Sequence, residues 1–361
     1  MSHSDARIKP GHCRENTAKD RIVSTSPFID GRPLDIDLPL HVTEIEMGSP
    51  SGATFLMLHG FGASSFTWRH WAPKLAKRGR VLCVDYKGFG AAPKPSSDSY
   101  ELTDQAKTLV QLVDQLGLGR VTLVGHSLGG GIALLVSKEL CRRAEKRLDC
   151  LVLVSSLAYS QRLSPFIPLS RNVRLSRFLV HTLGPQRLVR WILHSIVHDP
   201  GVITSEMVDA YALPLRTRPG VDAALATGRS ILVSGTRHIS DRISEIDVPT
   251  LLMWGANEKV VPYWVGERLA EELPDARLVT IQQCGHIPPE EAPGESFSIL
   301  SSFLEDVEYA GTTSRRREVN ASESISPYHT ELSRSESVGD PGRLKQVARQ
   351  EQSPEHDRWH C

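Results

Sequence analysis

Short apolar runs alternate with amphipathic segments along most of the chain. Each run ends near glycine or a polar residue, which is typical of strands buried on both faces of a parallel sheet. These runs are residues 54–58, 81–84, 121–124, 151–154, 250–254 and 277–281, and a further strand is expected within 41–47. Helical patterns are found over residues 64–78, 103–116, 132–140, 265–273 and 296–308. The alternation predicts an α/β domain with a mostly parallel sheet and helices on both of its faces.

The alternation stops between residues 158 and 244. Helical patterns remain over 173–183 and 186–197, but no strand pattern separates them, and prolines and glycines interrupt the stretch. We therefore predict an inserted helical cap over 158–244. The α/β core would then have two parts, residues 21–157 and 245–308.

The two ends of the chain differ from this core. Residues 1–20 are polar, and residues 309–361 are rich in Ser, Arg, Glu and Gln with few large apolar side chains. Such a composition buries too little apolar surface to offset the chain entropy lost on folding. We predict a flexible leader over 1–20 and a disordered tail over 309–361.

The composition narrows the class of protein. The apolar and charged fractions, 40% and 23%, are typical of a globular chain, and the zero net charge does not favour a nucleic-acid partner. The six cysteines are scattered without metal-ligand spacing, so we expect reduced thiols and a cytoplasmic protein. The N-terminus lacks the apolar core of a signal peptide, and no apolar run of about eighteen residues predicts a membrane span.

The pentapeptide Gly125-His126-Ser127-Leu128-Gly129 carries the strongest chemical signal. It directly follows an apolar strand and directly precedes a helix. A serine hydroxyl is a weak nucleophile, and a sharp strand-to-helix turn presents it to a base and a substrate together. The flanking glycines permit that turn and let the strand and helix pack closely. We predict that Ser127 is a catalytic nucleophile.

A serine nucleophile needs a general base and a carboxylate that orients the base. His286 follows the last predicted strand, and Glu258 lies in a loop after the preceding one. The chain order serine, acid, histidine is that of a nucleophile-elbow hydrolase. Asp247 and Asp275 both precede strands, at the opposite edge of the sheet. We predict that Glu258 and His286 complete the triad, with a solvated surface glutamate as the alternative interpretation of Glu258.

An oxyanion hole needs two backbone N–H donors. Leu128, directly after the nucleophile, should provide one of them. Phe61, in the loop His59-Gly60-Phe61-Gly62, should provide the other. We interpret His59 and His126 as structural histidines that shape their turns. No metal-binding cluster and no phosphate-binding loop occurs in the sequence, so we expect no cofactor.

These motifs together resemble the α/β-hydrolase superfamily over roughly residues 40–308. The resemblance rests on Leu58-His59-Gly60-Phe61-Gly62, Asp85-Tyr86-Lys87-Gly88-Phe89-Gly90, Gly125-His126-Ser127-Leu128-Gly129-Gly130, Trp254-Gly255 and Gly285-His286. It implies an α/β-hydrolase fold of the branch with a helical cap after the sixth strand. Esterases, lipases, C–C bond hydrolases, haloalkane dehalogenases and epoxide hydrolases belong to that branch.

Two positions depart from the family pattern. The family usually has Asp where Glu258 stands, and the longer side chain would need an adjusted loop to reach His286. The family also often has Ser after the glycine of the Asp85 loop, where this chain has Ala91-Ala92, a position that we expect to be structural. The dehalogenases and epoxide hydrolases use an Asp nucleophile, because their alkyl-enzyme intermediate needs a carboxylate. Ser127 therefore argues against both activities.

The sequence favours a serine hydrolase that cleaves carboxylic esters of a small or lipophilic substrate through an acyl-enzyme. A C–C bond hydrolase of the meta-cleavage-product type, or another acyl-transfer enzyme, would use the same triad, and a non-catalytic binding protein is a third possibility. Apolar cap residues would cover an acyl site, namely Leu163, Phe166, Ile167, Phe178, Leu179, Trp191 and Ile192. Five cap arginines would suit peripheral contact with an anionic membrane, although a solvated face on the cap helices is the preferred explanation: Arg171, Arg174, Arg177, Arg187 and Arg190.

Overall fold

The computed structural model describes residues 29–45, 53–96, 99–143, 145–162, 167–234 and 236–323. The chain divides into two compact units, Met1–Gly311 and Thr312–Cys361. Of the second unit, the structure describes residues 312–323, which form the C-terminal part of helix α11 (Pro293–Glu323). The predicted leader, 1–20, lies outside the described residues.

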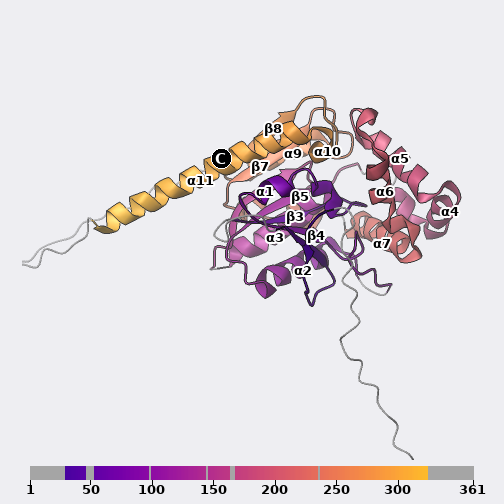
Figure 1. Ribbon diagram of the computed structural model, residues 1–361, viewed down its shortest axis with the longest axis horizontal. Helices are drawn as coiled ribbons and strands as arrows, with labels where there is room; N and C mark the ends of the chain where they lie inside the picture. The colour runs from indigo at the N-terminus through magenta and orange to yellow at the C-terminus, as the bar shows by residue number, and fades with distance from the viewer. Residues whose placement is uncertain are drawn as a thin grey trace, which may run out of the picture. The chain divides into compact units, whose positions relative to one another are not determined.

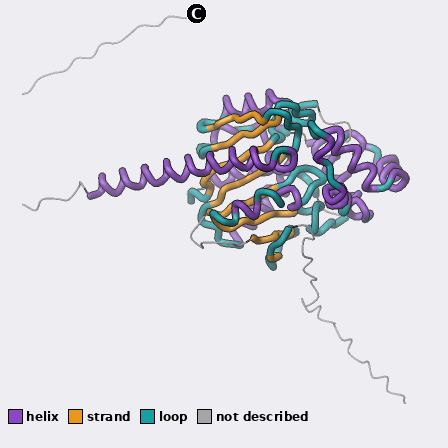
Figure 2. The backbone as a smooth tube through the Cα atoms, turned by 45° about the horizontal axis from the view of Figure 1, so that its top comes forward, coloured by secondary structure: helices purple, strands orange, loops and turns teal. Residues whose placement is uncertain are grey.

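An eight-stranded sheet is the centre of the first unit (Figure 2). Its strand order is β1-β2-β4-β3-β5-β6-β7-β8. The pairs β1–β2 and β2–β4 are antiparallel, and every pair from β4 to β8 is parallel. The mostly parallel α/β sheet predicted from the sequence is thus confirmed. The strands are β1 Arg32–Pro33, β2 His41–Ile45, β3 Ala53–Leu58, β4 Gly79–Asp85, β5 Val121–His126, β6 Leu148–Val154, β7 Thr250–Gly255 and β8 Ala276–Ile281.

Each central strand buries both of its faces, which explains the unbroken apolar runs. In β3, Leu56 and Leu58 contribute to one apolar cluster, and Phe55 and Met57 contribute to the other. Helices α2 (Leu102–Gln115), α3 (Leu128–Arg142) and α9 (Tyr263–Glu272) pack into the first cluster. Helix α1 (Ala72–Leu75) and the first unit's part of α11 pack into the second. The alternating side chains of a pleated strand therefore meet helices on both sides.

Between β6 and β7 the described residues form helices and no strand. Helices α4 to α7 gather at one end of the strands rather than on a face of the sheet (Figures 1 and 2). Apolar residues of α5 and α6 pack on Ala63, Phe66 and Ile287, which lie after β3 and β8. These segments are η2 Pro168–Arg171, α4 Val173–Leu183, α5 Pro185–Ile196, η3 Pro200–Val202, α6 Ser205–Ala212, η4 Pro214–Arg216, α7 Arg218–Ser234, α8 Arg237–Ser240 and η5 Ile243–Glu245.

Two expected helices have different bounds in the structure. Residues 64–78 form a short 3-10 helix, η1 (Ser65–Trp68), and the separate helix α1. Pro73 has no backbone N–H and fits only the first turn of a helix, so it begins α1 instead of lying inside a longer helix. The helix expected over 296–308 is the longer α11, which includes residues 309–323 of the predicted tail, and α10 (Pro288–Glu291) precedes it. Residues 324–361 lie outside the described residues.

None of the described helices is both long and apolar enough to cross a bilayer. No group of His, Cys, Asp and Glu in that part of the chain has the arrangement of a metal site. Cys83, Cys141, Cys150 and Cys284 are free thiols.

Candidate active site

Ser127, Glu258 and His286 come together although they are far apart in the sequence. Ser127 follows β5, Glu258 follows β7, and His286 follows β8. These strands belong to the parallel part of the sheet, so their carboxyl ends share one edge. Loops at that edge are where ligands bind in open α/β sheets. The structure therefore brings all three predicted triad residues to one place.

The turn at Ser127 has a strained backbone. Ser127 has φ 53° and ψ −115°, a conformation that side-chain-bearing residues rarely adopt. The neighbouring glycines are required by close packing. A Cβ on Gly125 would lie 2.6 Å from the Gly129 carbonyl oxygen, and one on Gly129 would lie 2.3 Å from the Leu58 carbonyl oxygen. The strand, the turn and helix α3 are thus fixed so that the Ser127 hydroxyl projects from the turn.

His286 links the serine to the carboxylate. Its Nδ1 lies 2.9 Å from Oε2 of Glu258, and its Nε2 lies 3.0 Å from Oγ of Ser127. A carboxylate can only accept, so the Nδ1–H donates to Glu258 and Nε2 is left to accept the Ser127 hydroxyl proton. The side chains of His286 and Glu258 are only 6% and 2% exposed. Little water competes for these hydrogen bonds.

Glu258 keeps its charge despite its burial. Burial raises the pKa of this carboxyl, but the positive charge and hydrogen bond of His286 lower it more, together with the Val260 N–H, and the net pKa is lowered. Its Oε1 accepts the N–H groups of Val260 at 2.6 Å and Val261 at 3.2 Å. The second oxygen therefore remains available to His286 in the ionised form.

A second carboxylate, on Glu291, holds the loop that carries His286. Its Oε2 accepts the Gly285 N–H at 2.9 Å, and its Oε1 accepts the Ile287 N–H at 2.9 Å, so it brackets His286 on both sides. The same Oε2 accepts the N–H of His198, at the end of the cap helix α5, at 2.6 Å. The sequence reasoning assigned no role to Glu291. Its place at the end of the Pro-Pro-Glu-Glu run 288–291 was the signal available in the sequence.

His126 is a structural histidine, as its interpretation from the sequence proposed. It is buried, and its Nε2–H donates to the His286 carbonyl oxygen at 2.8 Å. Burial and the nearby charge of His286 lower the pKa of His126 to about 3. A neutral ring can therefore brace the backbone of the His286 loop without adding charge beside the site.

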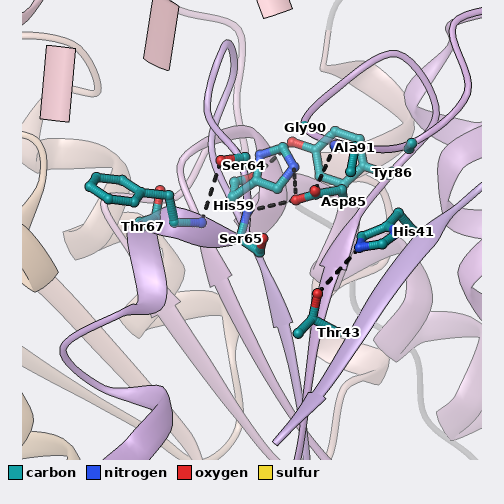
Figure 3. A network of polar contacts seen from close by, with 12 residues as sticks. His41, Thr43, His59, Ser64, Ser65, Thr67, Asp85, Tyr86, Gly90 and Ala91 are labelled. Carbon is teal, nitrogen blue, oxygen red and sulfur yellow. Dashed lines mark hydrogen bonds and ion pairs between the residues drawn. The ribbon is translucent and has the colours of Figure 1, made fainter. Parts of the chain in front are cut away.

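His59, in the same loop as Phe61, forms a second buried network with Asp85 (Figure 3). Asp85 accepts the Ser65 N–H at 2.6 Å and the Ala91 N–H at 2.8 Å, and it lies 3.8 Å from Nε2 of His59. Tyr86 stacks on His59, and its hydroxyl donates to the His59 carbonyl oxygen at 2.7 Å. The Ala91 side chain is not needed for these bonds, because the contact uses its backbone N–H.

Comparison with known proteins gives the family. Residues 53–293 match the family model described as the alpha/beta hydrolase fold. The chain belongs to the alpha/beta hydrolase family. The match includes the turn at Ser127, the Glu258 loop and His286, so it covers every segment of the site.

Individual members of the hydrolase family are similar at modest identity. A Bacillus subtilis protein, uncharacterized hydrolase YugF, is 28% identical over 71% of this chain and 91% of its own length. The 2-hydroxy-6-oxononadienedioate/2-hydroxy-6-oxononatrienedioate hydrolase 2 of Pseudomonas putida is 29% identical over 73% and 90%. Among solved structures, a bacterial membrane phospholipase A shows 26% identity and a TM-score of 0.63, covering 78% of this chain and 87% of that one.

A cavity of about 160 Å³ adjoins Ser127 and His286 in this hydrolase. Phe61 and Leu128, the residues predicted for the oxyanion hole, both line it. Leu128 is the first residue of α3. The first backbone N–H groups of a helix have no acceptor within the helix, so they can bind a ligand oxygen. Most of the remaining wall is aliphatic, from both the core and the cap, and includes Leu157, Val189, Ile192, Leu193, Leu215 and Ile287.

A second cavity, of about 470 Å³, lies among the cap helices and shares part of its wall with the first. The residues common to both are Phe61, Ile167, Ile192, Leu215 and Ala224. Among the cap residues expected over an acyl site, Ile167 and Ile192 line the cavity beside Ser127, and Leu179 and Trp191 line the second. Phe178 lines neither of these two cavities and is 62% exposed. Leu163 and Phe166 lie outside the described residues.

Buried polar contacts hold the cap over the site. The hydroxyl of Tyr211, on α6, lies 2.9 Å from Oγ1 of Thr67 and donates to Glu290. Glu290 in turn forms an ion pair with Arg69 at 2.9 Å. Because Tyr211 also lines the first cavity, these contacts position one wall of it against the core. No sequence pattern indicated them, since the partners come from three separate segments.

Proposed function

We propose that this hydrolase cleaves carboxylic esters through an acyl-enzyme formed on Ser127. The observation that carries the proposal is the continuous chain of contacts from Oγ of Ser127 through His286 to Glu258. A serine in hydrogen-bond contact with an imidazole that a buried carboxylate orients has the arrangement of an activated nucleophile. The strained backbone at Ser127 supports the same role.

In this mechanism Oγ of Ser127 attacks the acyl carbonyl while Nε2 of His286 takes its proton. The developing oxyanion accepts the backbone N–H groups of Leu128 and Phe61. His286 then donates the proton to the leaving alcohol, and the acyl group remains on Ser127. Water, deprotonated by His286, releases the acid and restores the serine. Glu258 stays ionised and stabilises the imidazolium in both halves of the reaction.

The cavity beside Ser127 favours a neutral, apolar acyl group. Its wall is largely aliphatic, and its polar side chains are those of Ser127, His286, His126, Gln161 and Tyr211. No lysine or arginine lines this cavity within the described part of the chain. An ionised group bound there would lose its hydration without gaining a cationic partner. A lipophilic ester avoids that loss.

A C–C bond hydrolase of the meta-cleavage-product type is the second candidate, because the relatives include hydrolases named for such substrates. They are the Pseudomonas putida hydrolase above and a 2-hydroxymuconate semialdehyde hydrolase, 27% identical over 73% of this chain. The substrate in the name of the first relative is a dicarboxylate. The absence of a lining cation among the described residues therefore ranks this candidate behind ester hydrolysis.

The decisive experiment is a panel of p-nitrophenyl esters of increasing acyl length, assayed with wild type and Ser127→Ala. We expect hydrolysis by wild type and a loss of kcat of roughly 10⁶-fold in the variant. A fluorophosphonate probe should label wild type and the matched variant Ser301→Ala, on α11, but not Ser127→Ala. Turnover of a meta-cleavage dicarboxylate with no ester hydrolysis would favour the second candidate. Equal ester hydrolysis by wild type and Ser127→Ala would refute the mechanism.

A further inference from the structure

Large apolar side chains are unusually exposed on the outer part of the cap. Leu169 precedes α4, Leu175, Phe178 and Leu183 lie on it, and Trp191 lies on α5; they are between 36% and 62% exposed. We call this surface, together with Arg171, Arg174, Arg177, Arg187 and Arg190, the α4–α5 face. Figure 1 shows α4 at the end of the cap farthest from the sheet. Contiguous exposed apolar side chains on a globular protein commonly mark a binding surface.

The segment that contains this face carries cationic side chains and no carboxylate. Residues 160–198 include six arginines and neither aspartate nor glutamate. Arg177 is neutralised by Asp222 of α7, at 2.6 Å. No carboxylate in the described part of the chain forms an ion pair with the other four arginines of the face, which are exposed: Arg171, Arg174, Arg187 and Arg190.

Helical spacing places these cations beside the apolar side chains. On α4, Arg174 and Phe178 are four residues apart and therefore lie on one side of the helix, with Leu175 between them. On α5, Arg187 and Trp191 have the same spacing, and Arg190 adjoins them. Cations interspersed with an aromatic and leucines on one helix face are the pattern of a helix lying in a membrane interface.

The second cavity is lined both by residues of this face and by residues that also line the cavity beside Ser127. Trp191, Leu183 and Leu169, all exposed, line that cavity together with Arg187. Its inner wall includes Phe61 and Ile192, which also line the cavity beside Ser127. A continuous series of apolar residues thus leads from the exposed rim to the nucleophile.

We propose that the α4–α5 face docks on an anionic lipid bilayer, and that the second cavity admits the acyl chain of a lipid ester to Ser127. The docking follows from the surface alone, whereas the acyl route rests on the proposed esterase function. Arginines attract anionic headgroups, and Phe178, Leu175 and Trp191 enter the boundary between headgroups and acyl chains. A lipid surface fits better than an acidic protein, because the exposed apolar side chains are spread among the arginines and the adjoining cavity suits a hydrocarbon chain.

Vesicle flotation tests the docking. The full chain is mixed with vesicles of phosphatidylcholine alone or of phosphatidylcholine with phosphatidylglycerol. We expect flotation with the anionic vesicles, weakened by added salt, and little with neutral ones. Each arginine near an anionic surface contributes roughly fivefold to the partition coefficient, so Arg174→Gln/Arg190→Gln should lower it roughly 25-fold. Lys77→Gln/Lys107→Gln, a double variant of equal net charge on the core, should bind like wild type.

The apolar contribution has its own variant. Phe178→Ser should weaken flotation on anionic vesicles, while Trp264→Ser removes an exposed tryptophan of α9 and should not. Neither Phe178 nor Arg174 or Arg190 lines the two cavities, so turnover of a soluble short-chain ester should be unchanged in these variants. Turnover of a long-chain ester presented in anionic vesicles should fall with binding.

The outcomes separate this proposal from the proposed function. Flotation without any ester hydrolysis would retain the docking and reject the acyl route. Equal binding to neutral and anionic vesicles, or wild-type binding by Arg174→Gln/Arg190→Gln, would overturn the docking even if the chain is an esterase. Binding to polyglutamate but not to vesicles would assign the face to an acidic protein instead.

Discussion

Glu258 binds His286 with one carboxylate oxygen, 2.9 Å from Nδ1, and binds its own loop with the other, through Val260 and Val261. The family usually has the shorter aspartate here. From the sequence alone, the longer side chain of Glu258 would need an adjusted loop to reach His286. The loop accommodates it by turning the two N–H groups back toward Oε1. The longer acid is therefore held from both sides rather than left mobile.

Replacement of Glu258 should separate the charge of the acid from its length. Glu258→Gln removes the carboxylate that fixes the Nδ1–H tautomer of His286, so kcat should fall by roughly 10³- to 10⁴-fold. Glu258→Asp keeps the charge but cannot reach both partners, so its loss should be smaller. Steady-state kinetics with a soluble ester measures both. Wild-type turnover by Glu258→Gln would show that Glu258 has no catalytic role.

Glu291 should act as a positioning residue for His286. In Glu291→Gln one oxygen becomes an NH₂ group that faces a backbone N–H of Gly285 or Ile287, and a buried donor loses its acceptor. We expect kcat to fall roughly tenfold or more with KM little changed, and the free energy of unfolding to fall by about 1–3 kcal/mol. Glu305→Gln, an exposed glutamate of α11, is the matched control. A variant that is destabilised but shows an unchanged kcat and pH–rate profile would limit Glu291 to a structural role.

Gly129, two residues after Ser127, should tolerate no side chain. In Gly129→Ala the Cβ would lie 2.3 Å and 2.4 Å from the carbonyl oxygens of Leu58 and His59, which are backbone atoms that cannot yield easily. We expect destabilisation of about 3 kcal/mol or more and loss of activity. Gly119→Ala is the control, because nothing lies within 4 Å of its Cβ and its φ is not positive; urea unfolding should change by less than about 0.5 kcal/mol.

His126 should make the fold sensitive to acid. Its pKa is lowered from 6.5 to about 3 in the folded chain, so below pH 6.5 the unfolded chain binds the extra proton and stability falls as pH falls. The contribution is present above pH 6.5 and is lost down to about pH 3, with a slope of up to about 1.4 kcal/mol per pH unit. His126→Gln keeps a donor for the His286 carbonyl but does not titrate. Urea unfolding between pH 7 and pH 4 should give a shallower slope for the variant, and parallel slopes would contradict the assignment.

Ile192 should control the acyl length that the site accepts, because it lines both cavities. Ile192→Trp would add a bulky side chain to the wall that the two cavities share. We expect kcat/KM for long acyl chains to fall strongly while that for acetyl esters changes little. Val233→Trp, at an exposed position of α7, controls for the added bulk. An unchanged chain-length profile would show that the acyl group does not enter the second cavity.

The sequence by itself predicted the mostly parallel sheet, which the structure confirms, and it proposed the helical insertion and the triad residues. Apolar runs such as 121–124 can only be satisfied by burial on both faces, and a glycine-flanked serine between a strand and a helix admits one turn geometry. Local patterns of this kind depend on neighbours in the chain, which the sequence contains directly. The same patterns misplaced the helix over 64–78, where a proline within an otherwise helical run starts a new helix.

The tertiary structure decided how those residues are held and what surrounds them. Whether Glu258 could reach His286 depended on the fold of its loop, and the brace by Glu291 joins His198, Gly285 and Ile287, from the cap and the histidine loop. The two cavities share Phe61, which follows β3, and Ile192, on α5, in their walls. Contacts between segments so distant in the chain have no periodicity or spacing that a sequence alone can display, because only the packed fold brings them together.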